Sequence, residues 1–269
     1  MKDRVSIFVA ILTTNSTVHM DIATLMSTMH QSNARSDNTK YSTGIFNGIN
    51  GYANARNSVA DYFLKRTLCD WLWFIDDDIV PPPDVMKLTT VEGADIIAPL
   101  MPTIKTLVTP ATNGGKRKLQ SSIPICASRY TNLDDLDSMT YIDMENENGI
   151  VEVDAVGMGC TLISRGVLKH PGMTLDGSYI RPDGVAMESD PDEPAAIFRY
   201  SVKPNGRLIS GEDYDFCRRA RQLGFEIKLN MDIFCGHQKV VDIGKVFAMK
   251  EYVHFAKDDK EALLEAREA

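Results

Sequence analysis

The fold is decided by Trp71–Pro83, which reads Trp-Leu-Trp-Phe-Ile-Asp-Asp-Asp-Ile-Val-Pro-Pro-Pro. Its first five residues are apolar and rich in side chains that favour β structure, which predicts a short buried strand. The three prolines prevent that strand from continuing, because a proline has no amide hydrogen to donate to a sheet. The three aspartates are therefore expected where a buried strand ends and the chain leaves the sheet.

The positions of Asp76, Asp77 and Asp78 predict a ligand site. In open α/β sheets, ligands bind outside the carboxyl ends of the strands. Side-chain alternation along a strand would point Asp76 and Asp78 one way and Asp77 the other. Adjacent carboxylates repel one another, and a divalent metal that carries a phosphate would neutralise them. A solvated acidic turn is the competing interpretation, and the adjoining apolar strand and prolines favour the metal site.

The segment before this strand reads as alternating strands and helices. Val5–Thr13 is a β-rich run, and the polar residues Thr13 and Asn15 at its end would suit a nucleotide base or ribose. His19–Met29 has apolar residues at helical spacing, and a second strand is expected around Ile45 and Phe46. A helix from Asn54 to about Leu68 then leads directly into the strand at 71–75, as in a parallel sheet.

Arg56 lies in the first turn of that helix, where the helix dipole disfavours a cation. A phosphate or an aspartate partner would explain this placement, and an ordinary surface arginine is the alternative.

A short helix is predicted at Asp84–Thr90 and a buried strand at Ala94–Leu100. Met101–Ser122 is polar and reads as a long loop, in which Lys116-Arg117-Lys118 is read as a solvated charge run rather than a contact to an anionic substrate.

The next segment reads as short strands separated by turns. Weak strands are expected at Ile125–Arg129 and Thr140–Asp143, and an alternating strand at Ile150–Asp154. Gly157 and Gly159 suit a backbone that passes close to another group. Residues 166–194 are rich in Gly, Pro and Asp and are expected to cover the acceptor side of the molecule.

Ser210–Gly224 is the second strong signal, because it has the start, apolar face and end of a helix. Ser210 is expected to cap the helix, with Asp213 completing a capping box, and Gly224 to end it. Asp213 shares the inward face with Phe216, whereas Glu212 is expected to point elsewhere. A carboxylate at this inward helix start suits a general base, and capping alone would explain it equally well.

His237 follows a further predicted strand and closes the predicted core. A lone histidine is more often structural, but here it would add a nitrogen donor to an oxygen-rich site and favour manganese over magnesium. The predicted organisation is one domain at 1–245, made of two halves at about 1–100 and 101–245. Residues 246–269 are predicted to form a C-terminal helical extension.

The length, net charge and cysteine content of the whole chain restrict the classes of protein to which it can belong. Its 269 residues can bury a substantial core. The net charge of −8 argues against a broad nucleic-acid-binding surface. Five scattered cysteines predict reduced thiols in a cytoplasmic protein. No apolar run approaches the roughly 20 residues that span a bilayer, so no membrane anchor is expected.

The ordered motifs together resemble one known family. They are the strand at Val5–Leu12, Ala-Arg-Asn at 55–57, Phe-Ile-Asp-Asp-Asp at 74–78, Val-Asp-Ala-Val-Gly-Met-Gly-Cys at 153–160, Gly-Glu-Asp-Tyr-Asp-Phe at 211–216 and Gly-His at 236–237. This set resembles the GT-A-fold glycosyltransferases, especially small family-two-like and phage-type members. The resemblance implies an α/β fold, Rossmann-like, with a mixed and mainly parallel sheet flanked by helices.

The resemblance also implies the roles of the site residues. A nucleotide-diphospho-sugar donor, a UDP-sugar, would lie at the first strand and the aspartate turn, and Arg56 would approach its nucleotide. Asp76 would contact the donor or the metal, Asp78 and His237 would ligate Mn²⁺ or Mg²⁺, and the part of Asp77 is left open. Glu212 and Asp213 would form the catalytic motif, with Asp213 as the base that deprotonates the acceptor hydroxyl. The motif favours inversion of configuration.

The acceptor is left open between a glycan, a small molecule and a hydroxymethylated base in phage DNA, the last of which would place the protein in a host cytoplasm. A nucleotidyltransferase that forms sugar nucleotides is the alternative enzyme. It would normally carry a Gly-rich basic loop after the first strand, where this chain has Thr13–Thr17. The third hypothesis is a non-catalytic protein that binds sugar nucleotides.

Overall fold

The computed structural model describes residues 5–14, 18–35, 38–48, 51–102, 105–109, 118–122, 125–135, 138–142, 146–174, 179–180, 186–187, 196–202 and 208–238. The chain divides into two units, the first formed by Met1–Met101 and Ile125–Gln238, the second by Pro102–Pro124 and Lys239–Ala269. The predicted C-terminal helix at 246–269, Asn15, Lys116 and Arg117 lie outside the described residues, as does much of the predicted excursion at 166–194.

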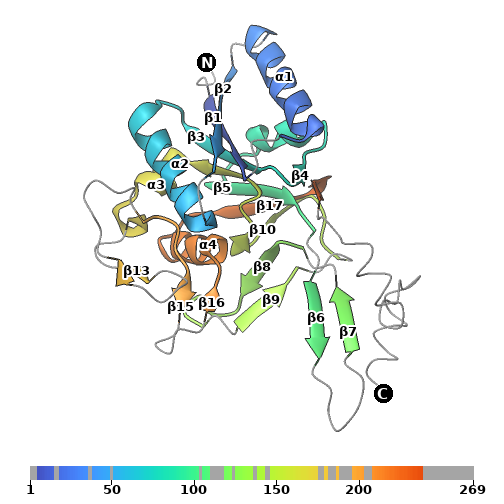
Figure 1. The fold of residues 1–269 in the computed structure, drawn as a ribbon, viewed down its shortest axis with the longest axis vertical. Helices are drawn as coiled ribbons and strands as arrows, with labels where there is room; N and C mark the ends of the chain where they lie inside the picture. Colours follow the sequence, from blue (N-terminus) through green and yellow to red (C-terminus); the bar gives the residue numbers. More distant parts are fainter. Residues whose placement is uncertain are drawn as a thin grey trace. The chain divides into compact units, whose positions relative to one another are not determined.

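The first unit is built on a seven-stranded sheet with the strand order β10-β17-β5-β12-β3-β1-β2 (Figure 1). Its strands are β1 (Val5–Thr13), β2 (Thr39–Asn47), β3 (Trp71–Asp76), β5 (Ile96–Leu100), β10 (Ile150–Glu152), β12 (Cys160–Ser164) and β17 (Ile227–Phe234). Only β12 and β10 run antiparallel to their neighbours, so the other five share one direction. The predicted fold class, an α/β protein with a mainly parallel central sheet, is confirmed.

Helices cover both faces of this sheet because the side chains of its strands alternate between two cores. Phe74 packs into one core with residues of α2 (Tyr52–Arg66), α3 (Arg165–Lys169) and α4 (Glu212–Gln222). Trp73 and Ile75 pack into the other with α1 (Met20–Arg35) and the 3₁₀ helix η1 (Val85–Thr90). Figure 1 shows α1 and α2 on opposite sides of the sheet.

Shorter strands form small sheets outside the seven-stranded sheet. The pair β4 (Ile79–Val80) and β18 (Gly236–His237) is antiparallel, and β11 (Ala155–Val156), β8 (Ala127–Tyr130) and β9 (Met139–Tyr141) form a three-stranded sheet. Two further pairs are β13 (Tyr179–Ile180) with β14 (Ala186–Met187), and β15 (Ser201–Val202) with β16 (Leu208–Ser210). The 3₁₀ helix η3 (Pro171–Met173) follows α3.

The prediction of one long loop at Met101–Ser122 is wrong. In the second unit, β6 (Lys105–Thr109) pairs antiparallel with β7 (Lys118–Ser122), so that Lys105 lies opposite Ser122. Both strands are short and largely polar, and a strand of this composition gives little signal until its partner is known. Across the described ranges, the structure contains no helix long and apolar enough to cross a membrane.

Candidate active site

The three aspartates lie at the carboxyl edge of the sheet. Asp76 is the last residue of β3, and its amide donates to the carbonyl of Gly159 at 2.9 Å. Asp77 and Asp78 form a turn, and the amide of Asp77 donates to the carbonyl of Leu12 at 2.9 Å. Strand alternation therefore ends at Asp76. The three carboxylates contact three different partners instead of alternating between two faces.

Arg56 joins the strand edge to α4. Its two terminal nitrogens, Nη1 and Nη2, donate to Oδ1 and Oδ2 of Asp76 at 3.2 and 3.0 Å, and its Nε lies 3.7 Å from Oε1 of Glu212. Arg56 is 3% exposed and Glu212 is 8% exposed, so both charges are buried. The guanidinium also lies over the ring of Phe74, 5.3 Å from its centroid. The predicted position of Arg56 in the first helix turn is wrong, because α2 begins at Tyr52 and Arg56 is its fifth residue. The aspartate partner foreseen for Arg56 is present.

Neighbouring carboxylates keep Arg56 in its charged form. Burial alone would lower its pKa, but the carboxylates of Asp76, Glu212 and Asp213 outweigh burial, and the pKa is raised. Among the hydrogen-bond partners that the structure describes, the Nε of Arg56 has none. The hydrogen bonds of Arg56 therefore go chiefly to Asp76. The carboxylate of Glu212 on α4 supplies a second negative charge beside the guanidinium.

Asp213 has the ionisation behaviour of a general base. Its side chain is half-buried, and Oδ1 accepts from the amide of Tyr214 at 2.8 Å. Burial is the largest cause that raises its pKa, the negative charge of Glu212 adds to it, and Arg56 partly opposes them, so that the pKa is about 6. A carboxylate with this pKa is ionised at neutral pH and still basic enough to accept a proton.

Two details of the predicted helix start are wrong. The residue that precedes α4 is Gly211, without a side-chain cap, and the hydroxyl of Ser210 donates to the carbonyl of Gly211 at 3.2 Å. Glu212 does not point away from the site, because it faces Arg56. Helix periodicity shows which residues share a face, but the first turn of α4 also contacts α2 along its flank.

The glycines at 157 and 159 bring the backbone against both groups of carboxylates. A Cβ added at Gly157 would lie 2.9 Å from Cβ of Cys126 and 3.8 Å from Oδ2 of Asp213. One added at Gly159 would lie 3.1 Å from Cδ1 of Ile79 and 3.4 Å from Oδ2 of Asp76. The predicted close approach is therefore present, and it occurs at the site itself.

Tyr200 is a site residue that the sequence did not indicate. It shares a hydrogen bond with Glu212, and burial, then the charge of Glu212, raises its pKa to about 12. Asn57 fixes this segment by bonding both backbone groups of Phe198, at 2.9 and 2.7 Å. The nearest signal in the sequence was Asn57, because a buried amide needs partners, but Asn57 bonds Phe198 and does not indicate Tyr200 itself.

Asp77 ties the first strand to the aspartate turn. Its Oδ2 accepts from the amide of Thr14 at 3.0 Å and lies 3.4 Å from the Thr14 hydroxyl. Thr13 is buried at the end of β1, and its carbonyl accepts from the amide of Gly48 at 3.3 Å. Thr13 and Asp77 therefore lie at one edge of the sheet.

Asp78 and His237 form a separate pair. Oδ2 of Asp78 lies 3.0 Å from Nε2 of His237, and the carbonyl of Asp78 accepts from the amide of Gln238 at 2.7 Å. The side chain of Gln238 reaches Nε2 of His19 at 2.7 Å. The pairing of β18 with β4 brings His237 to the aspartate turn across 159 residues of sequence.

The Asp78–His237 pair could hold a divalent cation only if a substrate or water supplied further ligands. Within the described ranges, no group of three His, Cys, Asp or Glu side chains is arranged to hold a metal alone. Asp76, the third predicted ligand, has both oxygens on Arg56. One carboxylate and one imidazole suit Mn²⁺, or Mg²⁺ less well, when phosphate oxygens and water supply the remaining ligands.

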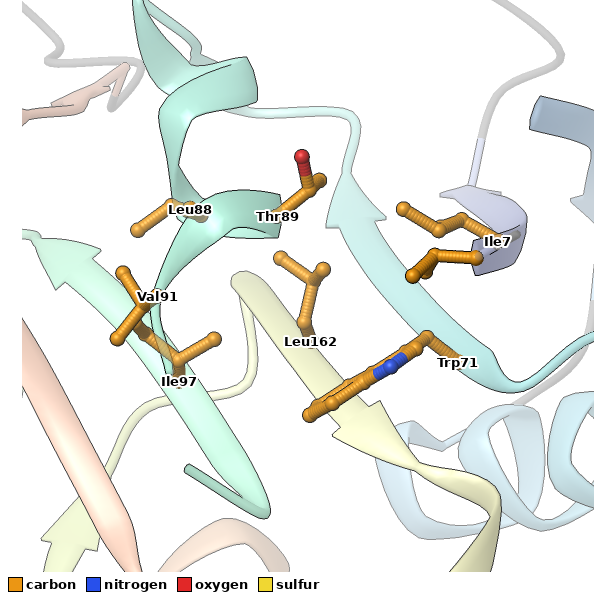
Figure 2. Close-up of a pocket in the computed structure, with 8 residues that line it drawn as sticks. Ile7, Trp71, Leu88, Thr89, Val91, Ile97 and Leu162 are labelled. Carbon is orange, nitrogen blue, oxygen red and sulfur yellow. The ribbon is translucent and has the colours of Figure 1, made fainter. Parts of the chain in front are cut away.

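A hollow elsewhere in the fold is not part of this site. Figure 2 shows it between η1 and the strands, lined by apolar side chains that include Ile7, Trp71 and Leu162. Its volume of about 10 Å³ is that of one water molecule. It belongs to the core on the α1 side of the sheet, whereas Arg56 lies over Phe74 on the other side.

Comparison with known proteins gives only distant likenesses. No family model and no curated protein matches the chain. Among solved structures, A197 from STIV has 16% identity over 87% of this chain and 86% of its own, with a TM-score of 0.45. GalNAc-T7 with UDP, GalNAc and Mn²⁺ has 12% identity over 89% of this chain, with a TM-score of 0.43.

The inositol-1-phosphate CTP transferase from T. maritima has 10% identity over 94% of this chain and 99% of its own, with a TM-score of 0.37. This chain spans 44% of the length of GalNAc-T7. All three TM-scores lie below 0.5, so these likenesses are too weak to identify the activity.

Proposed function

We propose that the chain is a metal-dependent glycosyltransferase that moves a sugar from a UDP-sugar to an acceptor hydroxyl with inversion. The observation that carries the proposal is Asp213, a carboxylate with a pKa near 6 beside the buried cluster of Arg56, Asp76 and Glu212. This cluster lies at the carboxyl edge of a mainly parallel sheet, where ligands of such sheets bind.

The placement of charge favours glycosyl transfer over nucleotidyl transfer. A neutral hydroxyl is a weak nucleophile and benefits from a base that takes its proton. A sugar phosphate is already ionised, so its attack on a nucleoside triphosphate needs cations rather than a base. In this cluster the described cation is Arg56, and it is already shared between Asp76 and Glu212. A raised carboxylate pKa at Asp213 therefore supports a hydroxyl acceptor.

The other residues hold the reactants. Asp78 and His237 would hold Mn²⁺ or Mg²⁺, which would neutralise charge on the departing diphosphate. Asp76, Asp77, Thr13, Asn15 and Arg56 are proposed to contact the donor.

In the reaction, the Asp213 carboxylate accepts the hydroxyl proton as the acceptor oxygen attacks the anomeric carbon. Glu212 keeps that carboxylate basic through its own negative charge. A single attack of this kind inverts the configuration of the sugar.

Product analysis tests the reaction type directly. The protein is incubated with Mn²⁺ and either UDP-, GDP- or dTDP-sugars, or a nucleoside triphosphate with a sugar 1-phosphate. We expect slow release of a nucleoside diphosphate from one of the nucleotide sugars, because water can replace the missing acceptor. Pyrophosphate release from the second mixture would instead establish the nucleotidyltransferase alternative. No turnover in either mixture, combined with donor binding, would favour a non-catalytic binding protein.

A change at His237 tests the metal assignment. In calorimetric titrations of Mn²⁺ in the presence of UDP, we expect His237→Ala to bind the metal about 10- to 100-fold more weakly, because half of the protein ligand pair is lost. His170→Ala is the matched control, since His170 packs against Phe225 away from the aspartate turn. Equal Mn²⁺ affinity in wild type and His237→Ala would remove His237 from the ligand set.

The remaining features rest on the family resemblance. We propose residues 1–245 as the catalytic domain, with a donor half and an acceptor half, and 246–269 as its extension. A cytoplasmic location and a phage-DNA acceptor are proposals of the same kind. A glycan or a small molecule is an equal candidate for the acceptor.

A further inference from the structure

A second charged cluster lies on α4, on the side of the helix that Asp213 does not use. Asp215 is fully buried, and three arginines surround its carboxylate. Nε of Arg219 lies 2.8 Å and Nε of Arg199 lies 3.2 Å from Oδ2, while Nη2 of Arg218 lies 3.3 Å from Oδ1. The hydroxyl of Ser201 also donates to Oδ1, at 2.5 Å.

The three arginines differ in how fully their donors are used. Arg219 is buried, and it also donates to the carbonyls of Met173, at 2.9 Å, and Ile197. Arg219 therefore ties α4 to the backbone at Met173 and Ile197. Arg199 reaches Asp215 through Nε, and its side chain is 30% exposed. Arg218 uses Nη2, and its buried Nε has no hydrogen-bond partner in the part of the chain that the structure describes.

The cluster carries more positive than negative charge. Counted over the ion-paired residues that the structure describes here, three guanidinium groups and one carboxylate leave a net charge of +2. Burial lowers the pKa of Arg219, and repulsion from Arg199 and Arg218 lowers it further, although Asp215 opposes both. The chain as a whole carries −8, so this surplus is local rather than general. A second anion would relieve the repulsion.

We propose that Arg199 and Arg218 form a subsite that binds a phosphate group. Both guanidiniums are held by one buried carboxylate, so their unused N–H donors are oriented before a ligand arrives. Planar N–H pairs of this kind match the oxygens of phosphate.

The subsite and the proposed base lie on different sides of the same helix. Arg218 follows Asp213 by five residues on α4, which corresponds to about 7.5 Å along the helix axis and about 140° around it. A phosphate bound there would be separate from the donor diphosphate, which is assigned to the aspartate turn. That separation rests on the proposed function, whereas the binding of phosphate does not.

A purely structural cluster makes a different prediction. If the arginines only tie the segment at 199–201 to α4, replacing Arg199 lowers stability by the same amount with and without phosphate. A subsite instead predicts that the effect depends on phosphate concentration.

The test is calorimetric titration with inorganic phosphate, without divalent metal and with chloride added to hold the ionic strength constant. We expect wild type to bind phosphate, and Arg199→Gln and Arg218→Gln to bind it at least about tenfold more weakly, because each loses a charged donor. Arg129→Gln is the matched control, since both terminal nitrogens of Arg129 are paired with Glu147. Its phosphate affinity is expected to equal that of wild type.

Three results would overturn the subsite: no phosphate binding by wild type, equal affinity in wild type and both glutamine variants, or an equal loss in the control. The use of two variants covers the case in which one of them fails to fold. Phosphate binding without turnover of any nucleotide sugar would leave the subsite in place and contradict the proposed function. The two proposals therefore fail separately.

Discussion

Replacing Asp213 with asparagine is expected to stabilise the protein at neutral pH and to lower transferase turnover by about 10²- to 10⁴-fold. The loss of turnover follows because an amide cannot accept the proton of the acceptor hydroxyl. The gain in stability follows because the ionised carboxylate is disfavoured by burial and by Glu212. Asparagine retains an oxygen that can accept from the amide of Tyr214. Donor binding is expected to survive.

The sign of the pH dependence follows from the direction of the shift. The pKa of Asp213 is about 6 in the folded protein and 3.8 in its ordinary state, so between these values the folded chain holds a proton that the unfolded chain has lost. The stabilising contribution of this proton is complete below about pH 4 and disappears as the pH rises through 6. Two pKa units correspond to roughly 3 kcal/mol, and solvent around the half-buried group reduces this to about half.

Urea unfolding at several pH values measures this difference without any substrate. The stability of Asp213→Asn relative to wild type is expected to increase between pH 5 and 7.5. Asp61→Asn is the control, because Asp61 pairs with the exposed Lys65 at 2.7 Å, and its difference from wild type should stay nearly constant. Wild-type turnover should also fall about tenfold per pH unit below 6. A pH-independent difference for Asp213→Asn, or unchanged turnover, would remove Asp213 from its role.

Elements with a strong local pattern could be predicted, and elements defined by their partners could not. The run at Trp71–Ile75 and the apolar spacing after Gly211 are complete signals in themselves, and they match β3 and α4. The strands β6 and β7 have no such signal, because they are recognisable only as a pair. The insertion of β12 between β3 and β5 likewise depends on contacts between distant segments.

The residues of the candidate site likewise fall into those that the sequence could place and those that it could not. Asp76 could be placed at the edge of the sheet because the aspartates and prolines that follow its apolar run predict an end to the strand, although the turn at Asp77 and Asp78 ends β3 before the prolines are reached. An aspartate was one of two partners foreseen for Arg56. Glu212 was placed on the wrong side because a helix start is contacted along its flank as well as on its apolar face. Tyr200 could not be found, because its contact with Glu212 depends on the position of a separate segment.

Removing Arg56 is expected to be the most damaging single change to stability at this site. Arg56→Ala should lower the free energy of unfolding by about 3–5 kcal/mol at pH 7, because it leaves two carboxylates without their counter-charge. The side chains of Asp76 and Glu212 are 20% and 10% exposed, so water can replace only part of the lost interaction. Lys65→Ala on the same helix is the control, since the exposed Lys65–Asp61 pair contributes only about 0.3–0.5 kcal/mol.

A second variant separates loss of charge from loss of packing. Adding Glu212→Gln to Arg56→Ala should restore part of the loss at pH 7, because it removes one of the unpaired charges. A cost that is unchanged by Glu212→Gln would show that Arg56 acts only by filling space over Phe74. In that case its ion pairs would not be what holds the strand edge and α4 together.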